Sequence, residues 1–323
     1  MISLPLQIAR CGVCPTGRNH GDRLYGRLDA VSRRGWSLFL TLSVLWGIPY
    51  LFLKIAVGSL APPMVVFGRC ALAAVLLLPL AAARGELRPV LPCWPWVLAF
   101  SLAEIAVPFA MLGYAEQRLS SSLTALLIAA VPLVGAVLTR ALNLGDRIDR
   151  RRLGGLLVGI VGVAALVGID VHGGDLVSVA AAGLAVLGYA AGPLLASTVL
   201  SELPGVGLAA VALGLNALWY APFAWFTRPT PVDAVPVKAW VAVAVLGVIC
   251  SALAFIVFFA LVAEVGPART TVITYVNPAV AVLLGVAVLG ESVTLGIVVG
   301  FPLVLLGSWL ATRGSVPAEP VGA

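Results

Sequence analysis

The sequence predicts an all-α polytopic membrane protein with ten transmembrane helices, arranged as two inverted repeats of five. Hydrophobic residues make up 61% of the 323 residues and charged residues 11%, with a mean hydropathy of +1.08. A water-exposed surface cannot be built from this composition. The apolar residues also come in runs of about twenty, the length at which a helix crosses about 30 Å of hydrocarbon, without the two-residue alternation of barrel strands.

A doubled motif supplies the third observation. A proline, a Leu-Gly-acid triplet and two glycines recur in the same order in each half, and from the triplet onward the copies keep an offset of 145 residues. The first copy is Pro132, Leu144-Gly145-Asp146, Gly155 and Gly162; the second is Pro278, Leu289-Gly290-Glu291, Gly300 and Gly307. Internal repeats of this kind are typical of transporter bundles.

Apolar runs place the spans in chain order. We predict them at residues 37–56, 63–83, 94–114, 122–141, 153–169, 176–197, 207–227, 238–262, 269–289 and 293–312. Five spans fall in each half, and an odd number makes the second repeat start on the opposite side of the membrane. The repeat is therefore predicted to be inverted.

Charged loops orient the bundle. A cytosolic N-terminus places most arginines inside, including the cluster at 147–152, and leaves Lys54, Arg118, Arg228 and Lys238 outside. This asymmetry follows the positive-inside rule, so both termini are expected in the cytosol of a cell with this protein in its inner or plasma membrane. It also explains the net charge of +6 without a nucleic-acid partner.

The expected domain limits follow from these spans. Residues 1–36 form a disordered cytosolic extension, 37–170 and 176–313 the two five-helix repeats, and 314–323 a cytosolic tail. Cys11, Cys14 and His20 lack the fourth ligand of a structural zinc site, and the groups around His172 are loosely spaced. No metal and no cofactor are expected.

Glu104 is the most unusual residue by its depth. It lies ten residues into the third span, about 15 Å along the helix and near the bilayer midplane. A carboxylate at that depth should face a cavity, pair with a cation or be protonated. Pro108 has no N–H for the Glu104 carbonyl, so a coupling-ion or substrate-amine site is one interpretation. A protonated acid bonded between helices is the other.

Two cations lie near the outer ends of the first two spans. Lys54 and Arg69 can snorkel to the surface, or they can gate the pathway and bind a substrate carboxylate. Neither matches Glu104 in depth. We therefore expect Glu116 to be the easier partner for either cation.

Matched prolines mark the fourth span of each half. Pro132 and Pro278 are expected to break their helices. Polar residues gather around the second break, and Thr270, Thr274 and Asn277 share a helix face there. We expect substrate contacts from these three residues and from Tyr275 and, in span six, Tyr189. The alternative is that their side chains only bond neighbouring helices.

The remaining motif residues suggest structural roles. Asp146 and Glu291 precede spans five and ten, where an acid complements a helix N-terminus. Gly155 with Gly159, and Gly296 with Gly300, give small-residue faces. These faces suit either packing within the chain or a homodimer.

With these residues in view, the chain resembles an EamA-type permease of the drug/metabolite transporter superfamily. The matching elements after residue 36 are Trp46-Gly47 with Lys54, Pro62 with Arg69, and the two copies of the doubled motif. Each copy, from its proline through the Leu-Gly-acid triplet to its two glycines, is called a cassette below. The resemblance implies ten helices around a cavity lined by spans one, three, four, six, eight and nine, and export or uptake of small metabolites. The second half departs from the pattern, because Tyr189-Ala190 stands where Trp46-Gly47 has its counterpart.

The predicted function is a secondary transporter of small metabolites, of the amino-acid or drug exporter class, working by alternating access with proton coupling. Its partners are a small-molecule substrate, the bilayer and protons. The sequence holds no phosphate-binding G-x-x-x-x-G-K-[ST] loop for ATP. A membrane-embedded enzyme such as a lipid transferase, or a non-transporting scaffold, is the alternative, and we expect no catalytic residues.

Overall fold

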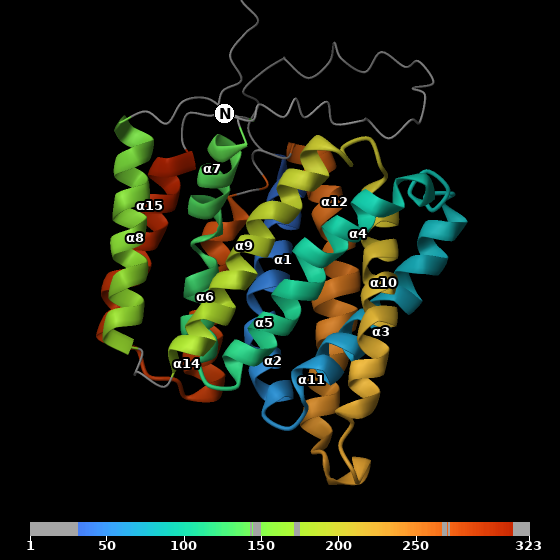
Figure 1. Ribbon diagram of the computed structural model, residues 1–323. Helices are drawn as coiled ribbons and strands as arrows, with labels where there is room; N and C mark the ends of the chain where they lie inside the picture. Colours follow the sequence, from blue (N-terminus) through green and yellow to red (C-terminus); the bar gives the residue numbers. More distant parts are fainter. Residues whose placement is uncertain are drawn as a thin grey trace, which may run out of the picture.

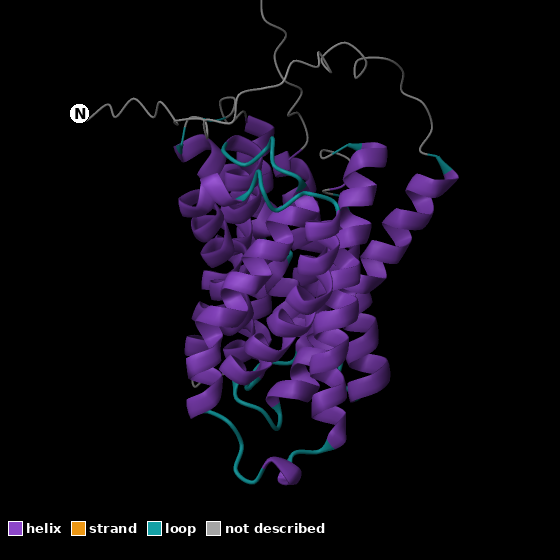
Figure 2. Cartoon of the chain, turned by 90° about the vertical axis from the view of Figure 1, so that its right-hand side faces the viewer, coloured by secondary structure: helices purple, strands orange, loops and turns teal. Residues whose placement is uncertain are grey.

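The computed structural model describes residues 32–142, 144, 150–170, 175–266, 270 and 272–312, and these residues are helical apart from short connections (Figures 1 and 2). The first half contains α1 (Arg33–Gly47), α2 (Pro49–Val57), α3 (Pro62–Ala83), η2 (Leu91–Cys93), α4 (Trp94–Ser101), η3 (Leu102–Ala106), α5 (Val107–Glu116), α6 (Ser121–Ile128), α7 (Val131–Ala141) and α8 (Arg150–Asp170). The second half contains α9 (Leu176–Thr198), α10 (Gly205–Phe226), η5 (Val232–Ala234), α11 (Val237–Gly247), η6 (Val248–Leu253), α12 (Ala254–Val265), α14 (Ile273–Leu289) and α15 (Leu295–Thr312).

These elements join into the ten expected spans. Within the described residues, nine continuous helical segments are long and apolar enough to cross a membrane. The tenth span is α14, an apolar helix of 17 residues as described. The all-α, ten-span prediction is therefore confirmed.

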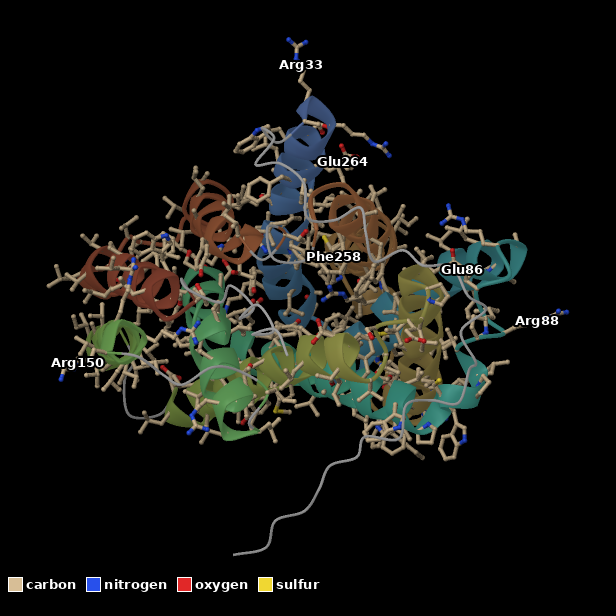
Figure 3. All side chains as sticks on the ribbon, turned by 90° about the horizontal axis from the view of Figure 1, so that it is seen from above. Arg33, Glu86, Arg88, Arg150, Phe258 and Glu264 are labelled. Carbon is tan, nitrogen blue, oxygen red and sulfur yellow. The ribbon has the colours of Figure 1, made fainter. Side chains whose placement is uncertain are left out.

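The fifth spans of the two halves show how the repeats are related. Helices α8 and α15 lie side by side at one edge of the bundle in both Figure 1 and Figure 3. A Cβ atom added to Gly155 would lie 2.8 Å from the carbonyl oxygen of Gly307, and one added to Gly300 would lie 2.8 Å from that of Gly162. The first glycine of each cassette thus meets the second glycine of the other.

This crossed pairing is the pattern of a two-fold axis, in which residue i touches j and j touches i. The pairing also shows that α8 and α15 run in opposite directions. Two repeats inserted in the same direction would make these equivalent helices run the same way. The small-residue faces on α8 and α15 are also occupied within the chain, which is the first of the two alternatives that the sequence left open.

A second contact between the halves builds the largest buried cluster. It joins α3 and α10, the second spans of the two halves, with α4, η3 and α5 beside them. Leu77 and Leu213 are among its fully buried side chains. Ile105 of η3 and Phe109 of α5, which flank Glu104 and Pro108 in the chain, belong to this cluster.

Candidate functional site

Glu104 lies in a π-helical segment rather than in a regular α-helix. The segment η3 covers Leu102–Ala106, and the N–H of Val107 bonds to the carbonyl of Leu102, five residues back. A π segment inserts one extra residue per turn and is frequent at functional sites. It also prepares the chain for Pro108, which has no N–H to donate. The predicted break at Pro108 is therefore a π segment followed directly by α5.

Two glycines of α9 make room for this segment. A Cβ atom on Gly192 would lie 2.9 Å from the Cβ of Glu104, and one on Gly188 would lie 2.4 Å from the carbonyl oxygen of Ala103. Glu104 Oε2 is buried against Gly192 and has no hydrogen-bond partner among the described residues. An acid placed without a partner at mid-span is costly unless it is protonated or binds a cationic group.

Arg69 provides the opposite charge in the same part of the bundle. Its side chain is buried, its Nε donates to Ser251 Oγ at 2.7 Å, and its guanidinium carbon lies 3.7 Å from the centroid of the Phe109 ring. Among the described residues, no carboxylate lies within 4.0 Å of this guanidinium. Arg69 is thus held by a hydroxyl and an aromatic face, with donors left for an anionic group.

Tyr189 lies near both charged residues. It lies on α9 against the buried clusters around α3 and α5, within Coulombic range of both Arg69 and Glu104. Tyr50 of α2 also lies near enough to Tyr189 and Arg69 to interact with them electrostatically. The predicted residues Glu104 and Arg69 are therefore both near Tyr189, and Arg69 comes from the second span, which is not among the spans expected around the cavity.

The second half repeats the π segment in its own third span. Here η6 covers Val248–Leu253 and contains Ser251, which links it to Arg69 in the second span of the other half. In the first half, Ser101 beside η3 accepts from Asn216 Nδ2 of α10 at 2.7 Å, and Tyr220 of α10 donates to the Ala106 carbonyl at 2.9 Å. Each π segment is thus bonded by the second span of the opposite half.

Lys54 does not pair with a carboxylate, contrary to expectation. Its Nζ donates at 2.6 Å to the backbone carbonyl of Glu116 and at 2.6 Å to that of Leu119. The carboxylate oxygens of Glu116 have no hydrogen-bond partner among the described residues. Glu116 is therefore not an ion-pair partner of Lys54 or Arg69 in this conformation, because free carbonyls at the end of α5 take the ammonium instead.

The matched prolines behave differently in the two halves. Pro132 follows a break between α6 and α7, as expected. Helix α14 continues through Pro278 without interruption, so the predicted break there is wrong. Close packing supports the uninterrupted helix, because Gly47 of α1 brings its backbone against Val280, and Asn277 bonds across the same contact.

The polar residues of α14, and Thr270 just before it, do not form one substrate-facing row. Thr270 is buried and its hydroxyl donates to the Gly266 carbonyl at 2.8 Å. Tyr275 bonds Thr312 of α15 at 2.8 Å. With its nitrogen placed toward the carbonyls, the Asn277 amide donates to Ser43 of α1 at 3.2 Å and to Ile273 at 3.1 Å. These three residues make the helix–helix and backbone bonds of the alternative interpretation, and Thr274 is also in contact with a partner.

Glu291 caps a helix, but not the one that follows it. Its carboxylate accepts from the backbone N–H groups of Ser121 at 2.7 Å and Ser122 at 3.0 Å, at the start of α6 in the other half. Thr294 caps α15 instead, through the Ile297 N–H. Glu291 also lines a rim cavity of about 420 Å³ together with Arg118. Asp146, its counterpart in the repeat, lies outside the described residues.

Sequence reasoning missed the neutral partners of the charged residues. Ser251, Phe109 and Tyr50 gave no charge signal within their apolar runs. Gly188 and Gly192, however, have the four-residue spacing of a small-residue face, which predicts a close approach by another helix. The sequence therefore held a signal for the close approach of α9 to Glu104.

Comparisons with known proteins agree with this architecture. The model of the EamA-like transporter family matches residues 33–168 and again 176–313. The "Uncharacterized inner membrane transporter YedA" of Escherichia coli K12 is 30% identical over 296 residues, covering 87% of this chain and 92% of that protein. The "Probable terminal-alkyne amino-acid exporter" of Streptantibioticus cattleyicolor is 27% identical over 295 residues, covering 88% and 92%.

A solved crystal structure supports the fold alone. It superposes with a TM-score of 0.63 at 20% sequence identity, covering 88% of this chain and 98% of its own. The family match, by contrast, extends over both halves and names a transporter rather than an enzyme. The chain belongs to the EamA-like transporter family.

Proposed function

We propose that this transporter moves a small polar or amphipathic metabolite by alternating access and couples that movement to protons. The observation that carries the proposal is Glu104, a mid-span acid in a π segment with one oxygen buried and unbonded. Such an acid can bind a proton on one side of the membrane and release it on the other. The crossed glycine contacts supply two related halves that can exchange conformations.

The charge arrangement suggests the kind of substrate. Arg69 offers unused donors to an anionic group, Glu104 offers an acceptor to an amine, and Tyr189 lies near both. A metabolite with a carboxylate and an amine fits both ends, and a relative described as an amino-acid exporter points to the same class. We assign Glu104, Arg69 and Tyr189 to the substrate and proton site.

Arginine placement supports the orientation that we propose. Arg33, Arg88 and Arg150 lie toward the end of the bundle from which Figure 3 is viewed. Lys54 is in the last turn of α2 and Lys238 is near the start of α11, and both helix ends lie at the opposite, lower end of the bundle in Figure 1. By the positive-inside rule, the arginine-rich end is cytosolic, in an inner membrane like that of the relative from Escherichia coli. Both termini then lie in the cytosol, and 37–170 and 176–313 are the two moving units.

A flux assay tests the proton-coupling proposal. Cells expressing the chain are first screened for tolerance to growth-inhibitory amino acids and their derivatives, which supplies a substrate. Purified Glu104→Gln is then compared with the wild type in liposomes with and without a pH gradient. We expect Glu104→Gln to lose gradient-driven accumulation by about 5- to 150-fold, the range of ordinary coupling free energies.

Glu202→Gln is the matched control, because Glu202 is exposed in the loop between α9 and α10. It should accumulate substrate like the wild type. Unchanged proton dependence in Glu104→Gln would reject proton coupling at this residue.

A further inference from the structure

Glu116, the last residue of α5, is a buried acid that the proposed substrate site does not use. Its side chain has 0% exposure, and neither carboxylate oxygen has a hydrogen-bond partner among the described residues. Burying an ionised carboxylate without donors is far more costly than burying the neutral acid. This conformation therefore suits a protonated Glu116.

The charged and titratable groups around Glu116 come from three other elements. Lys54 and Tyr50 approach from α2, Arg69 from α3 and Glu291 from the loop after α14. Within the described part of the chain, none of these cations lies within 4.0 Å of the Glu116 carboxylate. The negative charge of Glu291 further disfavours a second ionised acid beside it.

Lys54 is close to Glu116 but bonds its backbone. The ammonium is shared between the carbonyls of Glu116 and Leu119, both at 2.6 Å. It thereby fixes the final turn of α5 and the start of the loop to α6. The other end of the same loop is fixed by Glu291, through the N–H groups of Ser121 and Ser122. One short loop is thus clamped by α2 on one side and by the second half on the other.

We propose that Glu116 is a second proton-binding site, and that its ionisation opens this end of the bundle by moving Lys54 from the two carbonyls to the carboxylate. Opening releases the proton of the Glu116 carboxyl group to water at that end and leaves a hydrated Lys54–Glu116 ion pair. Closing reverses both steps: the acid takes up a proton, and the ammonium returns to the carbonyls. The inference rests on the proposed alternating access but not on Glu104.

A distance measurement across the two halves tests this switch. Gln117 is exposed on the loop that Lys54 holds, and Ser292 is exposed on the loop that carries Glu291. Spin labels on Gln117→Cys and Ser292→Cys, with the native cysteines replaced, report their separation in lipid nanodiscs without any substrate. We expect the fraction of long distances in the wild type to rise several-fold from acidic to alkaline pH, because ionisation of the carboxyl group is what opens this end.

Four variants show whether the pH response comes from Glu116 and Lys54 or from another acid. Glu116→Gln should keep the short distance at every pH, because it cannot ionise. Lys54→Met should show the long distance at every pH. Glu104→Gln and Glu202→Gln should keep the wild-type pH response, so a failure of proton coupling at Glu104 leaves this test intact.

Two results would overturn the switch. One is a wild-type distance that does not change with pH, as expected if an ordered water simply solvates a permanently buried acid. The other is a wild-type pH response in Glu116→Gln. If that variant does not fold, Glu116→Asp, which can still titrate, must retain the response and Lys54→Met must abolish it.

Discussion

Glu291 shows how one side chain is kept ionised at a membrane rim. Burial raises the pKa of its carboxyl, but hydrogen bonds from Ser122 and Ser121 outweigh burial and hold the pKa below its ordinary value of 4.5. The partial positive charge at the start of α6 acts in the same direction. Glu291 is therefore a fixed anion near neutral pH and serves as a clamp, in contrast to the proton-carrying roles proposed for Glu104 and Glu116.

This clamp has a predictable pH signature. A carboxyl whose folded-state pKa is depressed contributes its full stabilisation above the unfolded pKa and loses it as the pH falls through the folded pKa. We expect Glu291→Gln to lower the stability by about 1 kcal/mol near neutral pH, the usual value of a helix cap. Thermal unfolding in detergent should show this gap narrowing below about pH 4.5. A gap of constant size down to lower pH would contradict the assignment.

Individual charged residues could be found from the sequence, whereas their partners could not. Glu104 and Arg69 stand out because a charge in an apolar run has to be accommodated. Ser251 and Gly192, which accommodate them, come from spans of the other half, and no local pattern specifies which helices meet. The prediction that Glu116 pairs with a cation was wrong for the same reason. Helical rise gives the depth of a side chain, but it does not give the direction in which the side chain points or the backbone carbonyls that compete for the cation.

At the scale of elements, the third spans are the least predictable part of the fold. Both contain a π segment near the middle, at η3 and at η6, and only η3 has a proline directly after it. Hydropathy cannot distinguish a π turn from an α turn, since both are equally apolar. The correct prediction of a break at Pro132 and the wrong one at Pro278 show the same limit, because tertiary packing decides whether a proline interrupts a helix.

The contact between α8 and α15 yields a test with neighbouring residues. A Cβ atom on Gly155 would meet Ala311 N at 2.6 Å and Leu310 Cβ at 2.7 Å, whereas one on Gly154 would have open space. We expect Gly155→Ala to destabilise the protein by about 1–3 kcal/mol through overpacking. Gly154→Ala should be neutral or gain up to about 1 kcal/mol from helix propensity. Thermal unfolding in one detergent compares the pair, and equal effects would show that the helices are not this close.

At the scale of the whole molecule, the doubled cassette predicted the repeat, and the odd number of spans predicted its inversion. The crossed pairing of Gly155 with Gly307 and of Gly162 with Gly300 gives that inversion a physical basis, since the cassette glycines lie around the pseudo-two-fold axis. Neither the pairing nor the position of the axis follows from sequence spacing. Equivalent glycines were visible in the sequence, but their contact depends on how two helices far apart in the chain pack.

Inversion makes a direct prediction for equivalent loops. Ser59 follows the first span of the first half and Glu202 follows the first span of the second half, and both side chains are exposed. In a parallel repeat they would face the same compartment; in an inverted one they face opposite compartments. An impermeant maleimide applied to intact cells should label Ser59→Cys and should reach Glu202→Cys only after permeabilisation, because the arginine-rich end is the cytosolic one. Asp233→Cys, in the loop between α10 and α11, should label like Ser59→Cys. Labelling of Ser59→Cys and Glu202→Cys from the same side would refute the inversion, and external labelling of Glu202→Cys alone would refute the orientation.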